Sequence, residues 1–220
     1  LNEGLTSAEE AQARARIRDA VTSGWQTRSV PHARPTVADE LDNVLFYLTE
    51  VLYRVAPVFV EALEQALTDH YGQDVPDLHL ERLLHFGSWV GGDMDGNPNV
   101  TAETIIETLI TQRRAVIHCY LPDVRRLARY LSQTLPEAGF TDPFRQRLEE
   151  YSQRWPGVLE KLPVRHLEMP YRCFLQLVIH RLRATVHDDE VGYPDVREFE
   201  KDIELITSSL DANRGRHAGW

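Results

Sequence analysis

The sequence of 220 residues predicts a mainly α-helical chain with one or few short strands. Apolar residues recur at steps of three and four along most of the chain, which is the period of a helix with one buried face. Proline and glycine residues fall mostly between these periodic segments, as helix breakers do. Only residues 83–89 form a short apolar run that ends in glycines, in the manner of a strand. We expect residues 1–220 to form a single, mainly helical unit.

The N-terminal third predicts two helices separated by a linker. Ser7 and Glu10 have the spacing of a capping box, in which side chains satisfy free N–H groups of the first helical turn. Thr36 can cap a second, longer helix, and Gly72 is expected to end it. Pro57 either kinks this helix or begins a new one, because proline lacks the N–H that an interior turn requires.

The C-terminal half predicts a series of further helices. Thr101 follows a turn and precedes a run of isoleucine and leucine residues at helical spacing, so we expect it to cap a helix. Pro122 stands where a first-turn proline would start another helix, which would end near Leu135. The later periodic segments are residues 142–153, 170–186 and 195–212.

The composition is that of a soluble globular protein with an acidic balance. Asp and Glu number 34 against 24 Lys and Arg, and the formal net charge of −10 does not favour nucleic-acid phosphates. No apolar run in the sequence approaches the roughly 18 residues that span a bilayer. Cys119 and Cys173 lack the spacing of a zinc site or a disulfide framework. We therefore expect a cytoplasmic protein without a nucleic-acid or membrane partner.

Residues 83–101 are the most informative segment, because the predicted strand leads directly into a loop rich in glycine and aspartate. The glycines permit a sharp turn and a close approach of the backbone to a neighbour. A tryptophan adds a large, flat apolar surface, and the aspartates add carboxylates beside it. The segment predicts a binding site whose candidate residues are Trp89, Gly91, Gly92, Asp93, Asp95 and Asn97.

Three other interpretations of this loop remain open. Asp93, Asp95 and Asn97 resemble the start of a calcium loop, but Pro98 and Thr104 replace its sixth-position glycine and its twelfth-position glutamate. The glycines suggest a phosphate-binding loop, but they match neither the dinucleotide fingerprint nor the P-loop, and two carboxylates would repel phosphate. In the third interpretation, which is structural, Asp93 and Asp95 accept backbone N–H bonds and cap the next helix.

Residues 86–101 read Phe-Gly-Ser-Trp-Val-Gly-Gly-Asp-Met-Asp-Gly-Asn-Pro-Asn-Val-Thr. This run closely resembles the signature Phe-x-Ser-Trp-Met-Gly-Gly-Asp-Arg-Asp-Gly-Asn-Pro-x-Val-Thr of phosphoenolpyruvate carboxylase. Trp25-Gln-Thr27 and Arg34-Pro-Thr36 are similar to the family's Trp-x-Thr and Pro-Thr-Pro motifs, and Pro170-Tyr171-Arg172 resembles its later Pro-Tyr-Arg helix. The order and rough spacing of these motifs agree from about residue 17 to residue 186.

The resemblance implies an enzyme that joins phosphoenolpyruvate to bicarbonate, giving oxaloacetate and phosphate, with magnesium or manganese as cofactor. It implies a homotetramer and a helix-rich β/α barrel, with residues 83–89 as one strand and the loop at the active-site face. Carried over by position, Trp89 would form an apolar wall near the substrate, and Gly91 and Gly92 would permit close approach. The remaining loop residues, which would hold the loop and orient basic groups, are Asp93, Asp95 and Asn97.

The family's catalytic histidine, its later metal-binding carboxylates and its mobile glycine-rich loop have no counterpart in this sequence. The resemblance therefore implies an internal part of the enzyme that is inactive alone and binds no metal by itself. Met94 stands where the family has an arginine, and a thioether cannot make the bidentate anion contact of that arginine.

Arg172, in the Pro-Tyr-Arg segment, is a further candidate for substrate binding through an anion contact. Its alternative is an ordinary ion pair or stem packing on a helix surface. Two other classes of function also remain open for the chain. One is a stand-alone helical interaction module that keeps the loop without catalysis, and the other is a small metal-dependent lyase with Asp93 and Asp95 as ligands.

Overall fold

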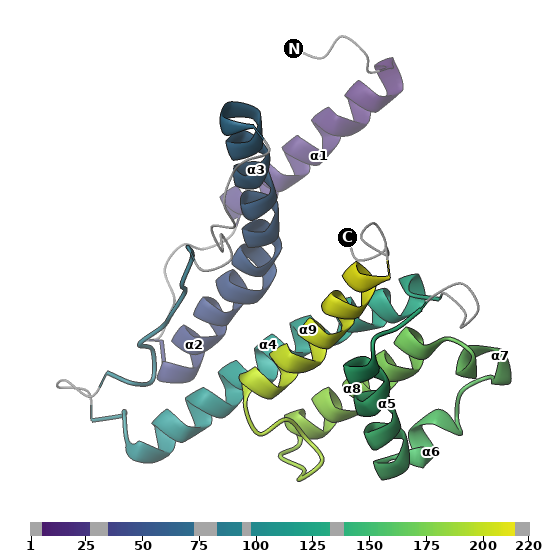
Figure 1. Ribbon diagram of the computed structural model, residues 1–220. Helices are drawn as coiled ribbons and strands as arrows, with labels where there is room; N and C mark the ends of the chain where they lie inside the picture. The colour runs from purple at the N-terminus through teal and green to yellow at the C-terminus, as the bar shows by residue number, and fades with distance from the viewer. Residues whose placement is uncertain (1–5, 27–34, 73–82, 94–97, 133–138, 214–220) are drawn as a thin grey trace.

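The computed structural model describes residues 6–26, 35–72, 83–93, 98–132 and 139–213 (Figure 1). Within these ranges the chain is mainly α-helical, as predicted. The elements are α1 (Ser7–Gln26), α2 (Val37–Phe46), the π-helical segment η1 (Tyr47–Leu52), α3 (Tyr53–Tyr71), α4 (Ala102–Tyr130), α5 (Asp142–Arg154), α6 (Pro156–Leu159), α7 (Val164–Leu167), α8 (Pro170–Val186) and α9 (Val196–Ala212).

The predicted strand is not formed in this structure. Residues 84–89 belong to no helix or strand, and the described ranges of the chain contain no strand at all. A strand needs a neighbouring strand to satisfy its N–H and C=O groups, and the elements described around residues 84–89 are helices. The prediction of one or few short strands is therefore wrong for the described residues, although the apolar character that suggested it is present.

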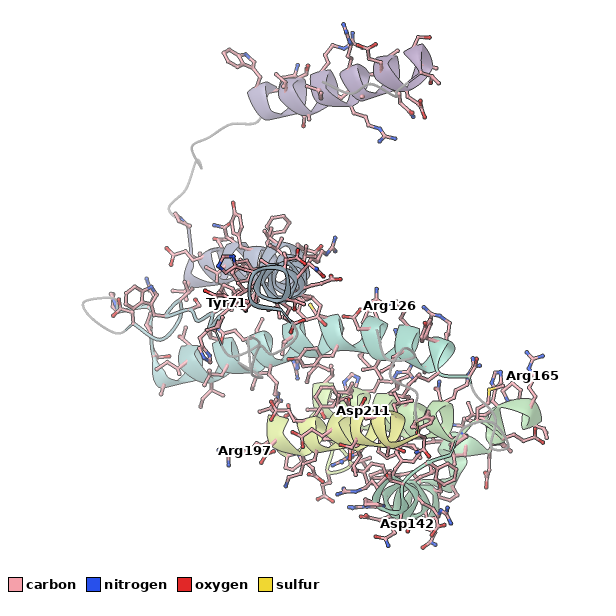
Figure 2. All side chains as sticks on the ribbon, turned by 45° about the horizontal axis from the view of Figure 1, so that its top comes forward. Tyr71, Arg126, Asp142, Arg165, Arg197 and Asp211 are labelled. Atoms are coloured by element: carbon pink, nitrogen blue, oxygen red, sulfur yellow. The ribbon has the colours of Figure 1, made fainter. Side chains whose placement is uncertain are left out.

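The caps of the first two helices follow from local sequence. The Thr6 N–H donates to Glu9 Oε2 at 2.7 Å, and the Glu9 N–H donates to Thr6 Oγ1 at 3.4 Å, so the capping box of α1 lies one residue before the predicted one. Thr36 caps α2 as predicted, with Asp39 as its reciprocal partner. No residue of α1 is buried, and Figure 2 shows this helix standing apart from the others.

The helix predicted to begin after Thr36 is continuous through α2, η1 and α3, and Pro57 lies inside it. The alternative in which Pro57 begins a new helix is therefore wrong. A proline ring crowds the carbonyl four residues earlier, which is that of Tyr53, and the widened π turn ends at the residue before Tyr53. Gly72 ends α3 with a φ of 78°, as predicted.

The helix α4 is also longer than predicted, because it runs through Pro122 without a break for 29 residues. The prediction of a new helix at Pro122 is wrong. Leu121 and Val124 on either side are buried in the core, and this packing compensates for the hydrogen bond that the proline removes. The segments predicted at 142–153, 170–186 and 195–212 form α5, α8 and α9 with shifts of one residue at most.

The core lies in the C-terminal half, where α8 packs along α4 and against α5, α6 and α9 (Figure 1). Most residues of α8 are buried, which explains why its apolar pattern extends around the helix. In contrast, Leu41 is the one buried apolar side chain among the described residues of α1, α2, η1 and α3. The N-terminal helices therefore contribute little to the core of this chain.

A buried polar network joins α5, α8 and α9. The fully buried carboxylate of Asp202 accepts hydrogen bonds from the hydroxyls of Tyr151, at 2.9 Å, and Tyr193, at 2.7 Å. Arg181 lies 3.7 Å from the same carboxylate and stacks on the Tyr193 ring at 3.9 Å. Burial raises the pKa of Asp202, and the hydroxyl donors and the nearby guanidinium oppose that shift. Buried charges persist in such a setting because they are paired and hydrogen-bonded.

One helix among the described residues is long and apolar enough to span a membrane by length and composition. It covers Val37–Tyr71, 35 residues, and contains an 18-residue window of mean hydropathy 1.3, none of it buried. The window reaches this threshold by its mean hydropathy, and the sequence still contains no uninterrupted apolar run of that length. The helix also carries Glu50 and Arg54, which form an exposed ion pair. Its apolar residues therefore do not surround the helix on all sides.

Candidate functional site

The loop after residue 88 closes in a tight turn that begins at Trp89. The Trp89 carbonyl accepts hydrogen bonds from the N–H groups of Gly92, at 2.9 Å, and Asp93, at 3.1 Å. The Val90 N–H donates to the hydroxyl of Ser88 at 3.1 Å. These bonds fold the predicted site residues Trp89, Gly91, Gly92 and Asp93 into one compact turn, whereas Met94, Asp95 and Asn97 lie outside the described residues.

Gly91 has the backbone conformation and the close contact that its sequence context predicts. Its φ is 76°, in the region that favours glycine, and a β-carbon on it would stand 2.2 Å from Oγ1 of Thr108. Thr108 is a buried residue of α4, so the turn is held against this helix. The sequence analysis did not identify Thr108. The one indication in the sequence is that Thr108 is a polar residue within the apolar run at the start of α4.

The structural interpretation of the loop assigned the cap of the next helix to aspartates. Instead, Thr101 caps α4, since the Thr104 N–H donates to Thr101 Oγ1 at 3.3 Å and the Thr101 N–H donates to Thr104 Oγ1 at 3.2 Å. The Thr104 hydroxyl also donates to the Asn99 carbonyl at 3.1 Å. The prediction for Thr101 is confirmed, and Asp93 is not the N-cap of this helix.

Trp89 projects from the turn with 83 % of its surface exposed. A tryptophan at a structural corner is usually packed, because burying its large ring is strongly favourable. The turn itself is fixed by backbone hydrogen bonds and by the contact of Gly91 with Thr108, neither of which uses the indole. Within the described residues, the indole of Trp89 is therefore not part of the packing that holds the turn.

The residues directly before this turn line an apolar groove between α4 and the continuous helix of α2, η1 and α3. We call it the α3–α4 groove. Its volume is about 950 Å³, and Phe86, Gly87 and Ser88 form part of its wall. Sequence reasoning missed the groove, because its other walls come from segments far apart in the chain. Those walls include Leu45, Leu48, Leu52, Val60, Val116 and Cys119.

The structure does not bring Arg172 to the loop. Arg172 lies in the first turn of α8, while the last residue of α8, Val186, accepts a hydrogen bond from Arg114 of α4 at 3.0 Å. The 17 residues of α8 place its two ends about 25 Å apart. Figure 1 shows α7, which directly precedes α8, on the opposite side of the molecule from the start of α4. Arg172 and the turn at Trp89 are thus separate features of this chain.

Among the described residues, the donor set near the loop does not fit a magnesium or manganese ion. The described part of the loop carries one carboxylate, that of Asp93, whereas these ions prefer several oxygen ligands in octahedral geometry. Across the described residues, no three His, Cys, Asp or Glu side chains come together as a metal-binding group.

Comparison with known proteins matches residues 1–218 of the chain to the family model of phosphoenolpyruvate carboxylase. A phosphoenolpyruvate carboxylase of Xanthomonas campestris pv. campestris (strain 8004) is 47% identical over 215 residues, which are 98% of this chain and 24% of that protein. That of Xanthomonas euvesicatoria pv. vesicatoria (strain 85-10) is 48% identical over the same length, with the same shares of the two chains. That of Prochlorococcus marinus (strain AS9601) is 29% identical over 233 residues, with shares of 94% and 23%.

The chain spans about a quarter of the length of the curated relatives that it matches. The family match covers the loop, the groove and all of the helices described above, and it agrees with the resemblance carried by residues 86–101. This chain belongs to the phosphoenolpyruvate carboxylase family and corresponds to part of that enzyme.

Proposed function

We propose that the complete enzyme carboxylates phosphoenolpyruvate with bicarbonate, giving oxaloacetate and phosphate, and that this chain supplies one wall of its substrate site. The observation that carries the proposal is the turn at Trp89. It has the family signature, it is held against α4 by Gly91, and it presents an exposed indole.

In this proposal the indole of Trp89 forms an apolar surface against the substrate methylene group, and its N–H is available to a polar partner. Gly91 keeps the backbone close to α4, and Gly92 leaves room for the substrate beside the turn. The remaining polar residues of the loop orient basic groups supplied from elsewhere in the enzyme, and they are Asp93, Asp95 and Asn97.

Arg172 takes part in substrate binding only if the complete enzyme brings another portion of the site to the first turn of α8, because that turn lies far from Trp89. The Arg172 guanidinium lies 3.8 Å from Sδ of Met169. Arg172 is therefore a candidate separate from the loop residues.

We further propose that the groups that perform the reaction lie outside this chain. The sequence has no counterpart of the family's catalytic histidine strand, and the described donor set does not fit a divalent metal. In this proposal magnesium or manganese is held by other parts of a cytoplasmic, tetrameric enzyme, and the isolated chain does not turn over phosphoenolpyruvate.

The test is a substitution of Trp89 in the complete enzyme. Trp89→Ala should lower kcat/KM for phosphoenolpyruvate by at least about tenfold, since losing one positioned apolar wall costs roughly 1–3 kcal/mol of transition-state binding. Val196→Ala, an exposed apolar residue of α9, is the matched control and should leave kcat/KM unchanged. Arg172→Ala, measured in parallel, shows whether that residue belongs to the site. A Trp89→Ala enzyme with the kinetics of the control would contradict the proposal.

A further inference from the structure

The long helix of α2, η1 and α3 has apolar side chains that this chain leaves uncovered. On one side, Leu48, Leu52 and Val60 line the α3–α4 groove. Elsewhere on the helix, Val55, Val58 and other large apolar residues are exposed. Monomeric soluble proteins rarely expose an apolar surface of this extent. Such a surface marks an interface with another protein segment or with a membrane.

The solvent-accessible surface of the chain exceeds that of a compact monomer of the same mass, and the excess indicates how much surface other polypeptide could cover. The solvent-accessible surface of the chain is 16481 Å². A compact monomer of 25.3 kDa exposes about 10,300 Å² by the usual scaling of surface with mass. The excess is about 6,000 Å², and an ordinary protein interface covers only about 800 Å² on each partner, with large obligate ones reaching about 2,500 Å². This excess is larger than an ordinary interface with a second copy of the chain would cover.

We propose that in the complete enzyme the α3–α4 groove is filled by apolar side chains from the part of the polypeptide outside this chain, and that this packing holds the turn at Trp89. The curated relatives are about four times as long as this chain, so the polypeptide that would supply the cover is available in the same molecule. The inference rests on one part of the proposed function, namely that this chain is part of that longer enzyme.

The groove is connected to the turn by the backbone itself. Phe86, Gly87 and Ser88 line the groove, and Trp89 follows directly. The Ser88 hydroxyl also accepts the hydrogen bond from the Val90 N–H, so the wall of the groove and the turn share a contact. Filling the groove would fix residues 86–88 and, through them, the position of the indole.

The charge of the chain disfavours the other occupant that an apolar helix suggests, which is a lipid bilayer. Glu61 and Glu64 also line the groove, and the chain has a formal net charge of −10, which opposes binding to an anionic membrane surface. A protein segment with apolar side chains and a polar or basic flank fits these walls better.

Cys119 provides a direct readout, because it lies in the groove wall and is partly exposed. Cys173 is the internal control, since it is buried and its thiol donates to the His166 carbonyl at 3.2 Å. Burial raises the pKa of both thiols, so labelling should be run at mildly alkaline pH.

The experiment is iodoacetamide labelling of the isolated chain and of the complete enzyme, with the modified cysteine identified by mass spectrometry. We expect Cys119 to react at least about tenfold faster in the isolated chain than in the complete enzyme, because reaction of a covered thiol requires local opening. Cys173 should react slowly in both. Equal rates for Cys119 in the two proteins would overturn the inference.

Two further arms exclude the other occupants. Protection of Cys119 that rises with the concentration of the isolated chain would assign the groove to a second copy, and protection by phosphatidylcholine–phosphatidylglycerol vesicles would assign it to a membrane. Either result overturns the inference. An active complete enzyme with a reactive Cys119 would contradict the groove assignment alone, whereas a protected Cys119 in an enzyme without carboxylase activity would contradict the proposed function alone.

A charged substitution in the groove tests the same claim by another route. Val60→Asp should leave the helix content of the isolated chain unchanged, because the groove is open there. In the complete enzyme it should raise Cys119 labelling by about tenfold and lower carboxylase activity, since a buried unpaired carboxylate is strongly unfavourable. Gln146→Asp, at an exposed polar position of α5, should have neither effect. A complete enzyme that tolerates Val60→Asp as well as Gln146→Asp would overturn the inference.

Discussion

Gly91 lies so close to Thr108 that a single β-carbon on the glycine would stand 2.2 Å from the threonine hydroxyl oxygen. The contact joins the turn of the candidate site to a buried position of α4, and the φ of 76° at Gly91 independently favours glycine. The contact between Gly91 and α4 therefore sets the position of the turn.

Gly91→Ala should lower the free energy of unfolding by about 1–3 kcal/mol, because it adds both backbone strain and a steric clash. The measurement is urea unfolding of the isolated chain followed by far-ultraviolet circular dichroism. Gly87→Ala is the matched control: no atom lies within 4 Å of its added β-carbon, so its effect should stay within about 0.5 kcal/mol. Equal effects of the two substitutions would mean that the contact with Thr108 does not hold the turn.

The network around Asp202 should be the most sensitive point of the core. Asp202→Ala removes the acceptor of two tyrosine hydroxyls and one carboxylate partner of the buried Arg181, which retains Glu198 at 3.4 Å. Breaking a buried pair in this way costs about 3–5 kcal/mol. Asp211→Ala, at an exposed position of the same helix, should change the free energy of unfolding by less than about 0.5 kcal/mol. A loss for Asp202→Ala as small as that of the control would show that the network does not stabilise the fold.

The same network predicts how stability changes at alkaline pH. Burial raises the pKa of Tyr151 from 10.0 to about 12, so between these values the folded protein binds more protons than the unfolded one. The stabilisation is complete below pH 10 and is lost as the pH rises through the folded-state pKa. Denaturant unfolding at several pH values should show this decline.

Tyr151→Phe should make that decline shallower by up to about 1.4 kcal/mol per pH unit, the contribution of one proton. Below pH 10 the ionisation of Tyr151 itself should no longer contribute to the difference in stability between wild type and Tyr151→Phe. Burial also raises the pKa of Tyr193, so part of the decline should remain in the variant. An unchanged slope in Tyr151→Phe would contradict the assignment.

Removal of the indole should lower the free energy of unfolding strongly at Trp155 and very little at Trp89. Trp155 contacts the Tyr151 ring with centroids 4.9 Å apart and packs against the core, whereas Trp89 is 83 % exposed. Trp155→Ala should cost about 3–5 kcal/mol, and Trp89→Ala less than about 0.5 kcal/mol, in urea unfolding of the isolated chain. A large loss for Trp89→Ala would mean that the indole serves the fold, and the argument that it is presented for binding would fail.

The parts of the fold that could be predicted from sequence are those determined within a few residues. Thr36 and Thr101 cap helices because their partners stand three residues away, and Gly72 ends a helix through its own backbone freedom. Residues 86–101 identified the candidate loop for a similar reason, because the motif is continuous in the chain.

The features that sequence reasoning missed depend on tertiary packing. Pro122 continues a helix because Leu121 and Val124 are held in the core, and Thr108 became significant only through its contact with Gly91. Arg181 is buried against Asp202 of another helix, and no neighbouring residue in the sequence indicates this contact. No local pattern contains these relationships, since each joins distant segments of the chain.

The most direct test of the central claim is to assay oxaloacetate formation by the isolated chain and by the complete enzyme, with phosphoenolpyruvate, bicarbonate and magnesium or manganese. A coupled malate dehydrogenase reaction would follow oxaloacetate through the absorbance of NADH. We expect turnover by the complete enzyme and none above background by the isolated 220 residues. Phosphoenolpyruvate-dependent oxaloacetate formation by the isolated chain would contradict it, because the reactive groups would then have to lie within this chain.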